Sequence, residues 1–290
     1  MPPMTPKAPP QIFNRSLLHL RRRRAARHFA EADFLHRAVV LDMIDRLESI
    51  ARPFDRVLAI GPGAHLVESL LTPEAGVRQL DCLDPFAGNA FPVDGIVRPQ
   101  TEPKYAAILS IMDLHMMDDP LAALTPMRLA LKPDGVMIAA LPGEETLHEL
   151  RDCLYQAETE ILGGVSPRLV PMAPLKSLGA LLQRAGFALP VADKIAMPVH
   201  YQNPVRLLHD LRAMGETAPL VQTAPPLRRA VLARAMALYE EKYGEEKGAK
   251  ASFDIVMLTG WAPHASQQKP LKPGSATHSL AQAILGNGKP

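Results

Sequence analysis

RVLAIGPGAHL, at residues 56–66, is the stretch that decides the fold. Its apolar run, residues 57–60, meets the turn Gly61-Pro62-Gly63 and then continues with helical spacing. A parallel α/β domain begins in this way when it holds a nucleoside-like cofactor at the carboxyl end of its first strand, because glycines let a ligand approach the backbone closely. Taken alone, Gly-Pro-Gly is more typical of an ordinary turn, and only the first two glycines of GxGxxG are present.

An acidic residue lies where this architecture uses one. Residues 80–83 predict a second short strand that ends at Asp84-Pro85. A carboxylate about 20 positions beyond the glycines grips the ribose hydroxyls of a cofactor. The alternative is an Asp-Pro pair that only initiates a turn. Position and residue type together favour ribose binding.

The chain up to residue 141 alternates between helical and strand patterns. A helical pattern covers residues 16–50, and residues 92–97 form a weak strand that carries Asp94. Continuous apolar runs at residues 105–111 and 136–141 are typical of strands buried on both faces, and a helix lies between them. This alternation predicts an α/β fold with a Rossmann-like, doubly wound, mostly parallel sheet.

The second half of the chain changes character. It predicts helices at 144–162, 175–185, 204–214 and 226–243, and sheet segments at 187–199 and 252–261. We therefore expect a disordered tail at 1–12, an α/β domain at 13–262 with a helical insertion around 144–250, and a C-terminal tail at 263–290.

Composition favours a soluble intracellular protein. The chain is 47% hydrophobic and 21% charged, and its net charge of +2 is too small to indicate nucleic acid or membrane binding. Cys82 and Cys153 lie far apart and outside any CxxC, which favours a reducing compartment and no zinc site. No metal site is expected from the spacing of the histidines, and no apolar run reaches the roughly 18 residues that span a bilayer.

The first thirty residues contain no acidic residue but carry the run Arg21 to Arg24. An acid-poor, arginine-rich start is typical of a mitochondrial presequence. It is equally typical of the solvated face of a first helix with a basic tip, and we favour that interpretation. RNA binding is disfavoured because no aromatic platform accompanies the arginines.

Several stretches together resemble the class I S-adenosylmethionine-dependent methyltransferases. They are residues 56–63, Asp84, residues 108–120, LALKPDG at 129–135 and ALLQRAGF at 180–187. A narrower resemblance joins IFNRSLLHLRRRRAA, DLHMMDDP and GWAPHASQQKPLKPGSA to bacterial relatives of the mitochondrial complex I assembly factor that has a methyltransferase fold. The malonyl-carrier-protein methyltransferase of biotin synthesis resembles the chain more distantly. The likeness extends from Ile12 to about Leu285, and the C-terminal motif is its most specific part.

This resemblance implies S-adenosylmethionine as the cofactor. It places Gly61 and Gly63 under the amino-acid part, Asp84 at the ribose and Asp94 at the adenine amino group. It also implies a floor beside the methionine end made of Asp113, Leu114 and His115.

The glycine loop departs from the family pattern at two positions. Family loops carry an acidic residue two positions before the first glycine, where this chain has Ala59, and His65 replaces the third glycine. Loss of the charge-assisted hydrogen bond to the cofactor's ammonium group costs about 1.5–3 kcal/mol, or roughly 10- to 150-fold in affinity. Asp113, at a neighbouring strand end, is the candidate substitute.

Methyl transfer needs alignment, and a base only when the acceptor carries a proton. His115 and Asp113 are the catalytic candidates, with packing or simple hydrogen bonding as the alternative role for His115. Glu144 and Glu145 follow the fifth strand, where they either border the acceptor pocket or act as first-turn acids of a helix. His264, Gln267 and Gln268 belong to the family-like tail, which suggests a docked or lid-like segment.

The favoured function is a methyltransferase acting on a protein side chain or a small carboxylate. One alternative is a complex I assembly factor with a degenerate cofactor site, which Ala59 and His65 support. Another is an arginine hydroxylase acting on a complex I subunit. We expect a bacterial cytoplasmic location, or the mitochondrial matrix as the alternative, and no nucleic acid partner.

Overall fold

The structure, a computed structural model, describes residues 10–86 and 103–268. In this part of the chain seven strands form one sheet in the order β2-β1-β3-β4-β7-β5, and β6 pairs with β7. The strands are β1 (Val57–Ile60), β2 (Leu80–Leu83), β3 (Tyr105–Ile111), β4 (Leu131–Pro142), β5 (Ala188–Tyr201), β6 (Gly244–Glu245) and β7 (Gly248–Trp261).

The first four strands form the parallel half of the sheet. β1 is parallel to β2 and β3, and β3 is parallel to β4. β7 then runs antiparallel to β4, and β5 runs antiparallel to β7. The predicted α/β fold with a doubly wound sheet is therefore confirmed.

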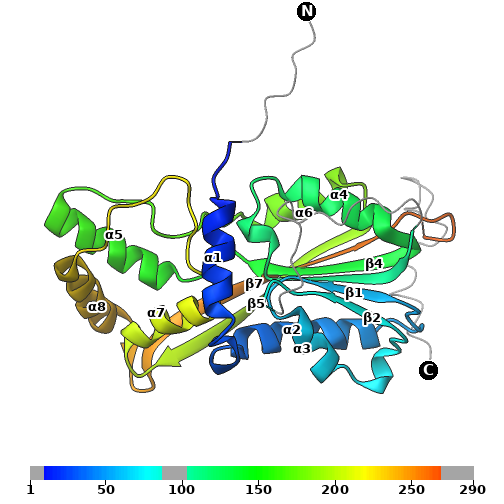
Figure 1. Ribbon diagram of the computed structural model, residues 1–290, viewed down its shortest axis with the longest axis horizontal. Coiled ribbons are helices and arrows are strands. Elements are labelled where there is room, and N and C mark those ends of the chain that lie inside the picture. Colours follow the sequence, from blue (N-terminus) through cyan, green and yellow to red (C-terminus); the bar gives the residue numbers. More distant parts are fainter. Residues whose placement is uncertain (1–9, 87–102, 269–290) are drawn as a thin grey trace, which may run out of the picture.

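Helices cover both faces of this sheet, as Figure 1 shows. α2 (Phe34–Glu48) and α3 (Ala64–Leu70) lie on one face, while α4 (Pro120–Ala130) and α6 (Leu175–Arg184) lie on the other. The strands between them are buried on both sides because alternate residues enter different cores. Val57 and Ala59 pack with α2, whereas Leu58 and Ile60 pack with α4 and α6.

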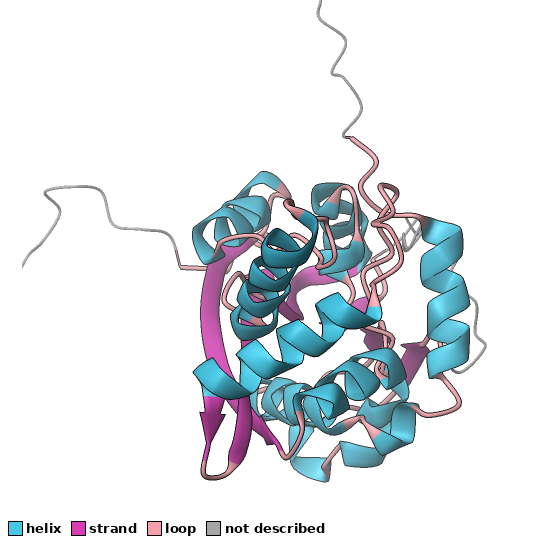
Figure 2. Cartoon of the chain, turned by 90° about the vertical axis from the view of Figure 1, so that its left-hand side faces the viewer, coloured by secondary structure: helices cyan, strands magenta, loops and turns pink. Residues whose placement is uncertain are grey.

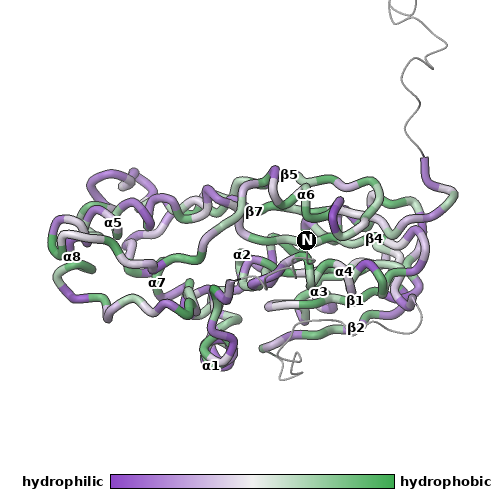
Figure 3. Tube along the Cα trace, turned by 90° about the horizontal axis from the view of Figure 1, so that it is seen from above, coloured by the Kyte–Doolittle hydropathy of each residue, from purple (hydrophilic) through white to green (hydrophobic). Residues whose placement is uncertain are grey.

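A second group of helices lies at the other end of the molecule. α5 (His148–Leu162), α7 (Pro204–Ala213) and α8 (Arg229–Tyr243) gather where the long strands β5 and β7 extend beyond the parallel strands (Figures 1 and 2). α1 (Arg15–Ala25) lies across the junction of this helical end and the sheet, on the side that faces the viewer in Figure 1 (Figures 1 and 3). Seen from above, the two parts form one elongated body (Figure 3).

The N-terminal helical pattern is two helices rather than one. α1 ends at Ala25, a short 3-10 turn occupies Phe29–Glu31, and α2 starts at Phe34. No glycine or proline marks this break, so the spacing of the apolar residues predicts a helix that continues through it. The break lets the Phe29 ring pack between His36, at 4.9 Å, and Phe86, at 4.5 Å. The prediction of a single helix over residues 16–50 was wrong because this tertiary contact decides the local conformation.

Two further boundaries differ from the predictions. The backbone N–H groups of Ile12 and Phe13 donate to Asp118 Oδ1 at 2.7 and 2.9 Å, so the chain is anchored before residue 13. α5 starts at His148, not at Glu144, because Leu147 adopts a left-handed φ of 53° immediately before it. The weak strand predicted at residues 92–97 lies outside the described residues.

Among the described helices, none combines the length and apolar character needed to cross a membrane.

Candidate functional site

The candidate site lies at the carboxyl ends of β1, β2 and β3. The chain passes from β1 through α3 to β2 on one side, and β3 pairs with β1 on the other side. Strand order reverses at this point, and ligands of open α/β sheets bind in the crevice that such a reversal leaves. The carboxyl ends carry Gly61, Asp84 and Asp113 respectively.

The glycine loop has the backbone that its sequence predicts. Gly61 and Gly63 have φ values of +112° and +80°. A Cβ at Gly61 would lie 2.1 Å from the Ile111 carbonyl oxygen, and one at Gly63 would touch Phe29, His36 and Leu66 at 3.3–3.4 Å. Only glycine can occupy position 61, because the backbone there has a positive φ and a side chain would collide with the end of β3.

Asp84 is buried and faces the glycine loop. Its Oδ2 accepts from the His65 backbone N–H at 3.1 Å and lies 2.5 Å from His65 Nδ1, while Oδ1 accepts from the Phe86 backbone N–H at 2.8 Å. The His65 side chain is 44% exposed and Asp84 only 1%. A half-exposed imidazole therefore covers the carboxylate predicted to bind ribose.

The end of β3 carries two buried polar pairs. Arg22 Nη1, from α1, donates to Asp113 Oδ1 at 2.6 Å. His115 Nε2 lies 2.8 Å from Glu216 Oε2, and these side chains are only 2% and 9% exposed. Leu114 packs in the apolar core beneath α4. The predicted residues 113–115 are thus together, but only Asp113 and His115 make polar contacts.

Several buried polar atoms around these pairs have no hydrogen-bond partner among the described residues. They are Arg22 Nε and Nη2, both ring nitrogens of His36, His115 Nδ1 and Glu216 Oε1. Burial lowers the pKa of His36 to about 4, although Glu216 opposes this shift. Burial would raise the pKa of Glu216, but His115, His36 and Arg22 together outweigh burial and lower it. Such unpartnered groups are rare in protein interiors and mark places where a ligand or water completes the bonding.

Three residues of this cluster escaped the sequence predictions. The arginine run predicts a solvated position for Arg22, yet Leu18, Arg22 and Ala25 form the buried stripe of α1. The helical phase of this stripe was the signal that could have identified Arg22. The helical phase of α2 likewise places His36 on the buried face with Val40 and Met43. Glu216 carries no local signal, because it reaches the site only through the course of the loop after α7.

A cavity of about 480 Å³ lies next to this cluster, between the end of β3, α1, α5 and α7. Met112, Met116 and Glu216 line it from the side of the cluster, and Leu147 and Leu150 from the side of α5. Met112 has a left-handed φ of 46°, as Leu147 has. Non-glycine residues in this conformation carry strain of about 1–3 kcal/mol and concentrate at functional sites.

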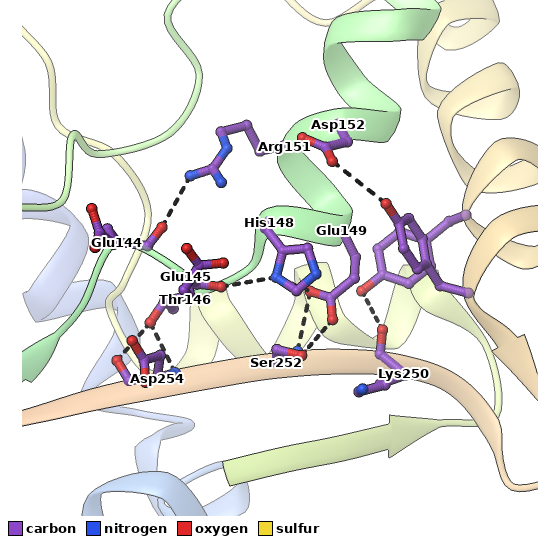
Figure 4. Close-up of polar contacts among 12 residues, drawn as sticks. Glu144, Glu145, Thr146, His148, Glu149, Arg151, Asp152, Lys250, Ser252 and Asp254 are labelled. Atoms are coloured by element: carbon purple, nitrogen blue, oxygen red, sulfur yellow. Dashed lines mark hydrogen bonds and ion pairs between the residues drawn. The ribbon is translucent and has the colours of Figure 1, made fainter. Parts of the chain in front are cut away.

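The wall that leads into α5 is fixed to β7 by buried hydrogen bonds (Figure 4). Thr146 Oγ1 donates to the Asp254 carbonyl at 2.9 Å and accepts from the Asp254 N–H at 3.1 Å. Glu149 accepts from both the hydroxyl and the N–H of Ser252. These contacts hold Thr146 and Leu147 at the cavity.

Other predicted residues lie apart from the cavity. Glu144 and Glu145 are exposed, precede α5 and do not line the cavity, so neither predicted role holds. Gln267 Nε2 donates to Asp134 Oδ1 at 2.8 Å, which places the start of the C-terminal segment at the opposite end of β4. Asp94 lies outside the described residues. In the described part of the chain, no three His, Cys, Asp or Glu side chains are grouped to hold a metal ion.

Comparisons with known proteins identify the family. A family model described as "Methyltransferase domain" matches residues 22–190. "Arginine-hydroxylase NDUFAF5, mitochondrial" of Danio rerio is 35% identical over 262 residues, which are 86% of this chain and 81% of that protein. "Malonyl-[acyl-carrier protein] O-methyltransferase" of Xylella fastidiosa is 26% identical over 84% of this chain and 88% of that protein.

The crystal structure of the YcgJ protein of Bacillus subtilis has a TM-score of 0.49 and 14% identity, covering 78% of this chain and 99% of that one. The family model and the relative that is 35% identical show that the chain belongs to the methyltransferase-domain family, together with the NDUFAF5 proteins.

Proposed function

We propose that this chain binds S-adenosylmethionine beside the glycine loop and transfers its methyl group to an acceptor in the adjoining cavity. The observation that carries this proposal is the position of the cavity of about 480 Å³. Met112 lines the cavity and is the immediate neighbour of Asp113, whose side chain lies against Gly61. Cofactor and acceptor sites would thus meet at the end of β3.

The residues present fit this cofactor. Gly61 and Gly63 turn the chain at the end of β1, and Asp84 presents a buried carboxylate at the ribose position. The ribose hydroxyls would donate to Asp84 once the half-exposed His65 has turned toward solvent. Leu114 would support the methionine end from below, and Asp94 is proposed for the adenine amino group. Bound S-adenosylmethionine supplies an electrophilic methyl group on a sulfonium centre.

His115 is the proposed base for an acceptor that carries a proton. When the Nε2–H group donates to Glu216, Nδ1 keeps its lone pair and can accept the proton. Glu216 would then stabilise the imidazolium that forms, as a buried carboxylate does in other histidine-based sites. Asp113 is occupied by Arg22, so we assign it to cofactor binding rather than to proton transfer.

The acceptor is proposed to be a protein side chain or a small carboxylate. Arg151 and Arg212 line the cavity, which favours an acceptor that carries negative charge near its methylated atom. A carboxylate oxygen carries no proton and can accept the methyl group without a base. An acceptor with an N–H or O–H group would use His115.

Calorimetry with S-adenosylmethionine tests the cofactor. Wild type should bind it, and Asp84→Asn should weaken binding by about 10-fold or more, since a charge-assisted hydrogen bond is lost. Asp55→Asn, at an exposed carboxylate, is the matched control and should leave affinity unchanged. Absence of wild-type binding at millimolar cofactor would overturn the proposal.

A second candidate function is arginine hydroxylation. The name of the Danio rerio relative, an arginine hydroxylase, favours it. Glu216 Oε1, which is buried at the cavity and has no hydrogen-bond partner among the described residues, would also suit a guanidinium. Mass spectrometry of proteins from a strain with and without this chain separates the two functions. A modified side chain heavier by a methylene supports methylation, and one heavier by an oxygen supports hydroxylation.

An assembly role in respiratory complex I is the proposal that follows from the resemblance to its assembly factor. It would locate the chain in the bacterial cytoplasm or the mitochondrial matrix. Recovery of complex I subunits in a pull-down, irrespective of added cofactor, would support a role that does not depend on methyl transfer.

A further inference from the structure

The buried pair of Arg22 and Asp113 lies directly against the glycine loop. A Cβ built on Gly61 would be 3.3 Å from the Asp113 Cβ. Arg22 reaches this point from α1, and both side chains are only 8% exposed. The pair thus brings a guanidinium and a carboxylate to the place where the amino-acid end of a bound cofactor would lie.

The guanidinium of Arg22 is only partly satisfied. Nη1 donates to Asp113 Oδ1 at 2.6 Å, but Nε and Nη2 are buried and have no hydrogen-bond partner among the described residues. Leaving a buried cation under-bonded is costly, so a role confined to sealing α1 against the sheet explains this arrangement poorly. Nε and Nη2 form a planar fork that matches the two oxygens of a carboxylate.

Because position 59 is an alanine, the carboxylate that binds a ligand's ammonium group must come from another residue. Ala59 is fully buried within β1 and offers no charge to a ligand's ammonium group. Asp113, at the end of the adjacent strand, uses Oδ1 for Arg22, and its second oxygen can accept from an ammonium group. A zwitterionic α-amino acid would therefore meet one group of opposite charge at each of its ends.

We propose that Arg22 and Asp113 form the recognition site for the α-amino-acid end of the cofactor, with Arg22 binding its carboxylate and Asp113 its ammonium group. This assignment rests on the proposed function. It makes α1, a helix outside the parallel sheet, a direct contributor to cofactor specificity. It also makes Asp113 the replacement for the acidic residue that β1 lacks.

Two nucleosides that differ in the amino-acid end test the assignment. S-adenosylhomocysteine carries this end and 5′-methylthioadenosine lacks it. Calorimetry on the full chain should show that wild type binds the first more tightly. Arg22→Met should weaken S-adenosylhomocysteine binding by about 10- to 100-fold and leave 5′-methylthioadenosine binding within about twofold, because one charged contact is lost. Arg24→Met, on the exposed face of α1, should change neither affinity.

The outcomes separate this assignment from the proposed function. If wild type binds neither nucleoside, the proposed function fails and this assignment fails with it. If wild type binds S-adenosylhomocysteine and Arg22→Met retains that affinity, or loses both affinities equally, the assignment alone is overturned. Should Arg22→Met fail to fold, Arg22→Lys keeps the charge beside Asp113 but loses the fork, and it should show the same selective weakening.

Discussion

At the scale of single residues, the site depends on groups whose neighbours set their chemistry. Arg22 belongs to a run of four arginines, yet it alone of the run is buried, because it shares the inner stripe of α1 with Leu18 and Ala25. His65 stands where a third glycine was expected and covers Asp84. His36 is fully buried beneath the glycine loop, with Glu216, Arg22, Asp84 and His115 as its charged or titratable neighbours.

His36 should make the protein less stable in mild acid. Burial lowers its pKa from 6.5 to about 4, so between these values the unfolded chain binds a proton that the folded chain does not. Stability must therefore fall as the pH drops below about 6.5, by about 2 kcal/mol between pH 7 and pH 5 from this residue. Urea titrations at both pH values should show that His36→Leu loses this part of the pH dependence.

The exposed His28 provides the control for this experiment. His28→Gln should keep the wild-type difference between pH 7 and pH 5. The low pKa of Glu216 acts in the same direction at lower pH, so both measurements stay at or above pH 5. Equal pH dependence in wild type and His36→Leu would contradict the prediction.

At the scale of elements, a buried carboxylate on α5 holds the loops that form one wall of the cavity. Glu158, on α5, is fully buried and accepts from Arg168 Nε at 2.7 Å and from the Ser166 N–H at 2.7 Å. Arg168 also donates to the Pro225 carbonyl at 3.0 Å, which joins the loop before α8 to the same cluster. Arg168 and Pro225 both line the cavity, so this cluster fixes one of its walls.

Removing one partner of this pair should destabilise the helical end. Glu158→Ala leaves the largely buried Arg168 without its counter-ion, and breaking a buried ion pair typically costs about 3–5 kcal/mol. Glu160 lies on the same helix as Glu158 and forms an exposed ion pair with Arg234 of α8. Glu160→Ala should therefore have a much smaller effect. Urea unfolding measures both, and the double change Glu158→Leu with Arg168→Leu should recover much of the loss. Equal losses for the two alanine variants would refute this account of the wall.

At the scale of the whole molecule, distant segments converge on one edge of the sheet. α1, α2, the ends of β1, β2 and β3, and the loop with Glu216 all contribute side chains to the candidate site. α1 lies across the junction of the sheet and the helical end, so it contacts the site from the side that faces the viewer in Figure 1. A ligand bound there should stabilise the chain as a whole rather than one loop.

Cofactor binding should therefore raise global stability. Free S-adenosylhomocysteine at 100 times its Kd should raise the free energy of unfolding by about 2.7 kcal/mol if only the folded chain binds it. Hydrogen exchange should slow in α1 and around Glu216 as well as in the glycine loop. Slowing confined to residues 61–66 would argue against convergence of these segments on the ligand.

The sequence by itself determined the fold class, the strands β2 and β3, the glycine loop and the position of Asp84. These features follow from apolar runs, turn residues and spacing, which act over a few residues. Only the tertiary structure decided which polar groups meet. Arg22 and Asp113 are 91 positions apart, and His115 and Glu216 are 101 apart. The break between α1 and α2 and the course of the loop after α7 bring them together. Local periodicity carries no record of those contacts, because they depend on how whole elements pack.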